Sequence, residues 1–358
     1  MKLSLFAMLI IVISNMSCNK HQNNTSNYLN EDLIPIDTTI IKEGQTLLGL
    51  VVERKIIGNY LILKDTSHPF YSMFDINTGN LIKEYSNKYV KNVVFPSISP
   101  NGFFISGDSV FILYSWSNKI FLLTKKGQYL KTIKLNYPNP DKLSTNITNC
   151  TFIFDSAKRT FIISSSYTSL GESRAKYIES TNISRFDIEG NFINTFGNYP
   201  KSYSRGNLFG GLYDGVYDNE YVYLLYSVGY PYIEKYNTKG KLVNKINNKG
   251  KAFNYRLNYF KGEFDPQTVP ANDSYFNFVL DNSKDNQIFY MDYTAMKGEL
   301  LLSGSDRYLL KHDIKYDTYS EHKIPSNLRL VSAKNNNIYM YSDSNEMHEI
   351  LLIKYKIE

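Results

Sequence analysis

Short polar turns and apolar β-type runs alternate along most of the chain. One pattern recurs six times: a few polar or small residues, then a run of β-branched, aromatic and aliphatic residues, as in "SGDSVFILYS" from Ser106. The first strand residues of successive copies lie 50, 50, 61, 67 and 50 positions apart. They are Tyr60, Val110, Thr160, Tyr221, Ile288 and Ile338. Repeats of about 40 to 50 residues that carry several strands each are typical of propeller blades.

A second repeat lies between the copies of the first and joins two alternating runs at a glycine. Stretches such as "FDINTGNLIKEY" (74–85) predict hairpins whose turn needs the positive φ that glycine adopts without strain. The glycines are Gly79, Gly127, Gly190 and Gly240. A fifth copy at 312–324 has Tyr316 and Asp317 instead, so we expect a turn that is longer or differently shaped there.

Together the two repeats predict an all-β fold, a six-bladed β-propeller of four-stranded antiparallel blades over residues 36–358. We name the strands of a blade a to d in chain order. The sixth copy ends at "EILLIKYKIE", which supplies strand c but leaves no residues for strand d. We expect "PIDTTIIKEG" (35–44) to pair beside that C-terminal strand and close the ring, which removes an open sheet edge.

The N-terminal 17 residues predict an export signal. Lys2 precedes an apolar run from Leu3 to Ile13, and 11 helical residues cover only about half of a ~30 Å hydrocarbon core. Cys18 follows, which predicts a lipoprotein whose lipidated Cys18 and flexible tether occupy 18–35. Asn15 stands where such signals usually carry Leu, so a plain secretory signal is the alternative. Because "NKHQNN" holds no acidic cluster, we favour the periplasmic side of the envelope over the cell surface.

At the level of families, the chain resembles the six-bladed, TolB-like β-propeller lipoproteins of Bacteroidota, and among them the domain-of-unknown-function family DUF4221. The resemblance rests on Cys18, on "MFDINTGNLIKEY", and on residues 95–135 and 221–246. It implies an exported propeller of unassigned activity. Because these motifs build blades, the resemblance carries no catalytic residue over to this chain.

The usual signatures of catalysis are missing from the sequence. Its five His residues show no metal-ligand spacing, and no G-x-S-x-G elbow, P-loop or G-x-G-x-x-G occurs. Cys150 is the only thiol besides Cys18 and is interpreted as a small buried hydrophobe. We therefore expect no catalytic residue, no cofactor and no resident metal, and we favour a protein that is not an enzyme.

Acidic residues supply the alternative function. A propeller brings strand ends from several blades together around its channel, where carboxylates can hold calcium or act as an acid pair. That would give a calcium- or acid-dependent hydrolase or lactonase. Turn formation explains most of these aspartates without any function. The candidates are Asp65, Asp108, Asp155, Asp214, Asp218, Asp265, Asp281 and Asp292.

The formal charge of +6 is modest for 358 residues, and its densest basic stretch spans 239–262. Basic residues mixed with aromatic residues can bind single-stranded nucleic acid, but export argues against that partner. An anionic glycan, a lipid headgroup or a solvated strand edge fits the stretch better. We expect a membrane contact through the lipid anchor only, no nucleic acid, and a monomer.

Loop length points to one face of the propeller. The predicted a–b and c–d turns are short, whereas the b–c and d–a connections are long and aromatic, and long loops are usually functional or disordered. We hypothesise a recognition face for a peptide, glycan or protein partner, since Tyr and Trp combine apolar area with a polar group. The alternative is that these side chains pack the loops onto the rim. The set is Trp116, Tyr167, Tyr177, Tyr199, Tyr203, Arg205, Tyr230, Tyr255 and Tyr259.

Overall fold

The computed structural model describes most of the strands and the short turns of the chain. Residues 1–28, with the predicted signal and Cys18, lie outside the described part, as does Cys150. The described residues are 29–42, 51–65, 70–87, 90–96, 100–138, 151–164, 181–198, 213–226, 232–247, 275–282, 287–295, 306–342 and 350–358.

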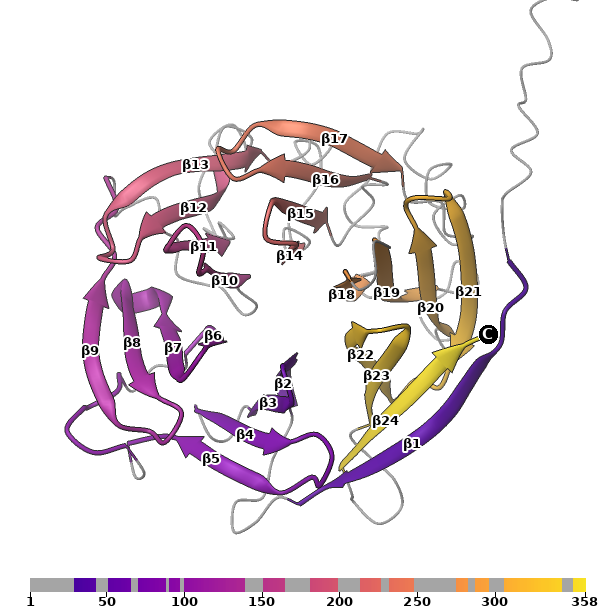
Figure 1. Ribbon diagram of the computed structural model, residues 1–358, viewed down its shortest axis with the longest axis horizontal. Helices are drawn as coiled ribbons and strands as arrows, with labels where there is room; N and C mark the ends of the chain where they lie inside the picture. Colours follow the sequence, from indigo (N-terminus) through magenta and orange to yellow (C-terminus); the bar gives the residue numbers. More distant parts are fainter. Residues whose placement is uncertain are drawn as a thin grey trace, which may run out of the picture.

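Six antiparallel four-stranded sheets surround a central axis, with strand a innermost and strand d at the rim (Figure 1). Blade 1 contains β2 (Val51–Ile57), β3 (Tyr60–Asp65), β4 (Tyr71–Asp75) and β5 (Leu81–Tyr85). Blade 2 contains β6 (Gly102–Ser106), β7 (Ser109–Tyr114), β8 (Lys119–Thr124) and β9 (Tyr129–Lys134). Blade 3 contains β10 (Phe152–Asp155), β11 (Thr160–Ser164), β12 (Thr181–Asp187) and β13 (Phe192–Asn198). Blade 4 contains β14 (Tyr213–Tyr217), β15 (Tyr221–Tyr226), β16 (Tyr232–Asn237) and β17 (Leu242–Asn247). Blade 5 contains β18 (Tyr275–Asp281), β19 (Ile288–Ala295), β20 (Asp306–Asp313) and β21 (Thr318–Ile324). Blade 6 contains β22 (Leu328–Lys334), β23 (Asn337–Ser342), β24 (Ile350–Ile357) and β1 (Leu33–Ile41).

The six-bladed propeller predicted from the two repeats is confirmed. Each predicted strand b begins within one residue of its expected position, and the one helical element of the described residues is the single turn η1 (Ser115–Ser117). No helix in the described ranges has the length and apolar character needed to span a membrane.

The ring closes as the sequence predicted, because β1 joins the last strand of the chain. Leu33 pairs with Ile357 and Ile41 with Ile350 in antiparallel register. The amide of Asp32 donates to the carbonyl of Glu358 at 2.7 Å, and the Glu358 amide donates back at 3.1 Å. Blade 6 is therefore built from both ends of the described chain (Figure 1).

The glycine turns between strands c and d have the backbone predicted for them. Gly79, Gly127, Gly190 and Gly240 have φ between 68° and 89°, and the register shifts by one residue in each of these four hairpins. The fifth turn differs in shape, as expected. Asp317 takes the positive φ of 49°, and β20 pairs with β21 without a register shift.

The apolar core lies in the seams between blades. The described core residues form six clusters, and each cluster joins two neighbouring blades. In β7, Val110 and Ile112 face blade 1, while Phe111 and Leu113 face blade 3. Because strand b is buried on both sides, its sequence is a continuous apolar run and not an alternating one.

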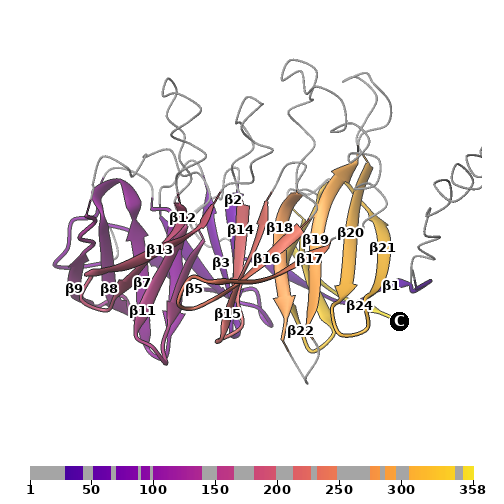
Figure 2. The same cartoon turned by 90° about the horizontal axis from the view of Figure 1, so that it is seen from above.

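The turns distinguish the two sides of the disc. The a–b and c–d turns are short, and we call the side that carries them the short-turn side (Figure 2). The b–c and d–a connections reach the opposite side, which we call the loop face. Most of the residues in those connections lie outside the described ranges.

Candidate functional site

Of the nine predicted recognition residues, the structure describes the backbone position of one. Trp116 lies in η1, between β7 and β8 on the loop face, and its side chain is outside the described part. The other eight lie entirely outside the described residues. The candidate site is therefore the turn Tyr114–Asn118 and its supports, which we call the Trp116 turn.

A buried asparagine of the adjacent strand a holds the Trp116 turn in place. Asn101 precedes β6 and is almost inaccessible to water. Its Oδ1 accepts hydrogen bonds from the amide of Ser115 at 3.0 Å and from the Ser115 hydroxyl at 2.8 Å. The carbonyl of Asn118, which has a left-handed φ of 52°, accepts from the amide of Leu135 at 2.8 Å. Both ends of the turn are thus fixed to other segments of the chain.

Aromatic rings support the same turn from below. Tyr114 stacks on Phe95 at a centroid distance of 5.8 Å and meets Phe121 edge to face at 5.2 Å. Such aromatic pairs contribute about 0.5 to 1.5 kcal/mol beyond their buried area. Burial raises the pKa of the Tyr114 phenol well above its ordinary value, so the ring stays neutral. Hydrogen bonds and ring contacts thus hold the backbone that carries Trp116.

An ion pair at the seam of blades 1 and 2 supports the segment that leads into Asn101. Lys64 on β3 is buried, and its Nζ donates to the carbonyl of Pro100 at 2.7 Å. Glu53 lies 3.6 Å from the same Nζ and accepts from the Tyr71 hydroxyl at 2.5 Å. The Lys64 ammonium is therefore held by the Pro100 carbonyl and the Glu53 carboxylate, which argues against a nucleophilic role. Sequence reasoning missed these residues because their partners lie on other strands.

Three of the suspected aspartates connect blades. Asp155, Asp218 and Asp281 stand at or just after the end of strand a in blades 3, 4 and 5, and each is at most 9% exposed. Each accepts hydrogen bonds from the a–b region of the next blade. We call them the inter-blade clamps.

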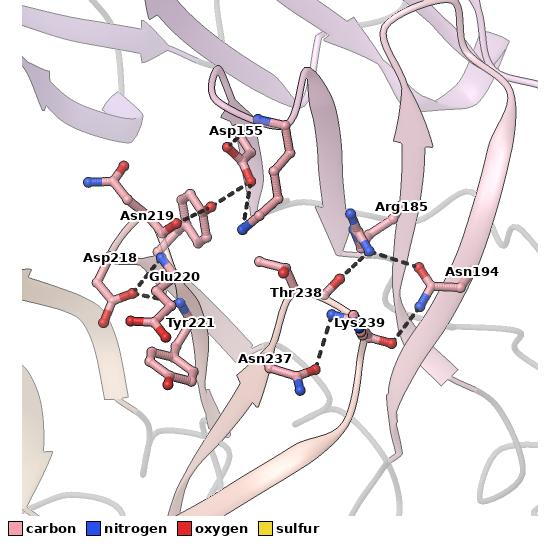
Figure 3. A network of polar contacts seen from close by, with 12 residues as sticks. Asp155, Arg185, Asn194, Asp218, Asn219, Glu220, Tyr221, Asn237, Thr238 and Lys239 are labelled. Carbon is pink, nitrogen blue, oxygen red and sulfur yellow. Dashed lines mark hydrogen bonds and ion pairs between the residues drawn. The ribbon is translucent and has the colours of Figure 1, made fainter.

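The first clamp is drawn in Figure 3. Asp155 accepts from the hydroxyl of Tyr217 at 2.6 Å and lies 3.5 Å from the Nζ of Lys158. Burial together with the Asp155 carboxylate raises the pKa of the Tyr217 phenol. Nearer the rim, Arg185 of blade 3 donates to the carbonyl of Thr238 in the c–d turn of blade 4. Blades 3 and 4 are thus connected by polar contacts at two distances from the propeller axis.

Asp218 accepts four hydrogen bonds through its carboxylate. Its Oδ1 accepts from the amides of Glu220 at 2.9 Å and Tyr221 at 2.6 Å, which closes its own turn. Its Oδ2 accepts from the Tyr223 hydroxyl at 2.8 Å and from Gln287 of blade 5 at 3.1 Å. Burial, then the hydrogen bond to Asp218, raises the pKa of Tyr223. A carboxylate with these partners is a structural acceptor.

The other described candidate carboxylates, Asp281, Asp292 and Asp108, lie in separate surroundings. Asp281 accepts from the amides of Asn335 and Asn336 of blade 6 at 3.2 and 2.8 Å. Asp292 is fully buried against Arg307 at 2.5 Å and accepts from the amide of Leu330 at 2.9 Å. Asp108 is exposed in an a–b turn.

The side chains of Asp65 and Asp214, and all of Asp265, are outside the described part. Among the described residues no three His, Cys, Asp or Glu side chains gather as metal ligands would.

A regular spacing in the sequence could have revealed the clamps. Asp155, Asp218 and Asp281 are successively 63 residues apart. The same strand end therefore carries an aspartate in three consecutive blades, which is the pattern of a repeated structural bond and not of a single site.

Comparison with known proteins supports the fold. No protein-family model and no curated protein matches the sequence. A crystal structure of a DUF4221 family member from Bacteroides vulgatus superposes with a TM-score of 0.61 at 10% identity, over 92% of this chain and 98% of that one. A Bacteroides fragilis protein described as exported superposes with a TM-score of 0.56 at 12% identity, over 94% and 97%. These matches confirm the resemblance to DUF4221 at the level of the fold.

Proposed function

We propose that this chain is an exported lipoprotein, anchored in the bacterial envelope through Cys18, and that it acts as a non-enzymatic binding module. Its partner is a peptide, glycan or protein that contacts the loop face. The fold similarity to a Bacteroides protein described as exported supports the envelope location. The carrying observation is that Asn101 and Leu135 fix the Trp116 turn on the loop face.

The described carboxylates favour binding over hydrolysis. A hydrolase at the channel mouth needs acids with free oxygens facing a common space. The carboxylate oxygens of Asp155, Asp218 and Asp281 instead accept hydrogen bonds from neighbouring blades. We therefore expect thermal unfolding to be unchanged by EDTA. A fall of several degrees that added calcium reverses would favour the calcium-dependent alternative.

Binding is tested with arrays of bacterial glycans and peptides probed by the purified protein. We expect Trp116→Ala to weaken the strongest array signal at least tenfold, because the residue supplies a large contact area at a rigid position. The matched control is Lys126→Ala, which changes an exposed c–d turn on the opposite side. Equal signals from both variants would contradict the assignment of the Trp116 turn.

Melting temperature separates recognition from packing. If Trp116 faces a partner, Trp116→Ala and the triple variant with Tyr203→Ala and Arg205→Ala melt within about two degrees of the parent chain. A loss of several degrees would show that these residues pack the loops onto the rim.

A further inference from the structure

We infer that the anchored propeller turns its short-turn side toward the lipid bilayer and presents the loop face away from it. The inference rests on the proposed lipid anchor at Cys18. It adds which surface meets the lipid headgroups and which surface is open to a partner.

The chain enters the propeller where a c–d turn belongs. In blades 1 to 5 a turn on the short-turn side connects strand c to strand d. In blade 6 this connection is open, and Asp32 and Glu358 stand there, joined by their two reciprocal backbone hydrogen bonds. The segment that leads back to Cys18 therefore starts from the short-turn side.

Contacts with blade 5 fix that starting point. The amide of Leu29 donates to the carbonyl of Tyr319 at 2.7 Å, and Tyr319 is the second residue after the c–d turn of blade 5. Glu31 accepts two hydrogen bonds from the Nζ of Lys311, at 2.8 and 2.9 Å. Residues 29–32 thus form a latch across the rim from blade 6 to blade 5 (Figure 1).

The tether is short. Eleven peptide units separate Cys18 from Leu29. Fully extended they reach about 40 Å, and as a flexible coil their root-mean-square span is about 18 Å. A lipid held in the bilayer therefore keeps the latch within a few nanometres of the headgroups, and the short-turn side is the side next to the latch.

Charge on the short-turn side suits an anionic lipid surface. Exposed basic residues at or beside the described a–b and c–d turns outnumber exposed acidic ones by seven to four, and at the open connection of blade 6 exposed Asp32 and Glu358 stand beside exposed Lys356. Basic groups within a Debye length of anionic headgroups are attracted to them by about 1 kcal/mol each. The basic residues are Lys126, Lys158, Arg159, Lys239, Lys241, Lys315 and Lys334, and the acidic ones are Asp108, Glu189, Glu220 and Asp317.

The test compares two labels at opposite ends of one strand. Ser326 and Lys334 are exposed; Ser326 lies in the turn before β22, the innermost strand of blade 6, and Lys334 ends that strand, which spans about 20 Å. Ser326→Cys and Lys334→Cys are made separately with Cys150→Ser, and each carries a fluorescent donor. The full lipidated chain is reconstituted into phosphatidylethanolamine–phosphatidylglycerol vesicles with an acceptor lipid in the outer leaflet.

We expect energy transfer from Lys334→Cys to be at least twice that from Ser326→Cys. Equal or reversed transfer, in protein that carries lipid on Cys18 by mass spectrometry and floats with the vesicles, overturns the orientation and leaves the anchor standing. A chain without lipid that does not float overturns the anchor and, with it, the orientation. The Cys18→Ser variant, which cannot carry the lipid, gives the background energy transfer for each label.

Discussion

Gly190, in the c–d turn of blade 3, lies against the backbone carbonyl of Lys134, which ends the outer strand of blade 2. A Cβ on Gly190 would collide with that carbonyl. The glycine thus serves two purposes, the positive φ of its own turn and the close approach of a neighbouring blade. We expect Gly190→Ala to lower the free energy of unfolding by more than about 3 kcal/mol, as measured by urea denaturation.

Gly107 offers the matched control for this effect. It also has a positive φ, of 58°, but an added Cβ would meet no atom within 4 Å. Gly107→Ala should therefore cost only the strain of the left-handed backbone, about 1 to 2 kcal/mol. Equal costs for the two substitutions would show that the contact between blades contributes nothing.

The clamp at Asp218 should contribute more to the free energy of unfolding than an ordinary turn aspartate does. Asp218→Ala removes the acceptor for Tyr223 and Gln287 and leaves the Tyr223 hydroxyl with only its longer hydrogen bond, of 3.4 Å, to Gln287 Oε1. We expect a loss of about 2 to 4 kcal/mol in urea denaturation. Asp108→Ala, at an exposed a–b turn, should cost less than about 1 kcal/mol. A clamp variant no less stable than this control would refute the structural role of the carboxylate.

The buried pair Asp292–Arg307 suits a double-mutant cycle. Both side chains are at most 2% exposed, so Arg307→Met takes the guanidinium away from a buried carboxylate and should cost about 3 to 5 kcal/mol. Adding Asp292→Leu removes that charge, and we expect it to restore at least half of the loss. If the double variant is less stable than Arg307→Met, the aspartate matters mainly through its bond from the amide of Leu330.

Acid should destabilise the propeller, first through His322. Burial lowers the pKa of His322 below its ordinary 6.5, against the nearby carboxylates of Glu31 and Asp32. The unfolded chain therefore takes up a proton more readily, and stability falls as the pH drops below about 6.5. His322→Gln should reduce the loss of melting temperature between pH 7 and pH 5. An unchanged pH profile in this variant would rule out the histidine as the cause.

Glu31 acts at lower pH. Burial alone would raise its pKa, but the hydrogen bonds from Lys311 and Ser320 outweigh burial and lower it below 4.5. Its contribution is present above the unfolded value and is lost as the pH falls through the folded pKa. Glu31→Gln should therefore reduce the additional loss of melting temperature below pH 4.5. Because it also removes a carboxylate that raises the pKa of His322, the loss between pH 7 and pH 5 should be larger than in the parent chain.

The sequence predicted those parts of the fold that local chemistry determines. The run from Val110 to Tyr114 indicated strand b of blade 2, and the four turn glycines marked the hairpins. It could not show that Gly190 meets Lys134 or that Asp218 bonds Gln287, because each contact joins segments about 55 to 70 residues apart. The same limit applies to Asn101, whose role depends on Ser115 across the blade.

Closure by β1 also sets an order of events in time. β1 is the first of the described strands to be synthesised and its partner β24 is the last, because Leu33 pairs with Ile357. Contacts of such long sequence separation form late and slow the whole reaction. The ring can close only after β24 has been synthesised, so the closed disc forms late in folding, whereas the hairpins inside each blade can form earlier.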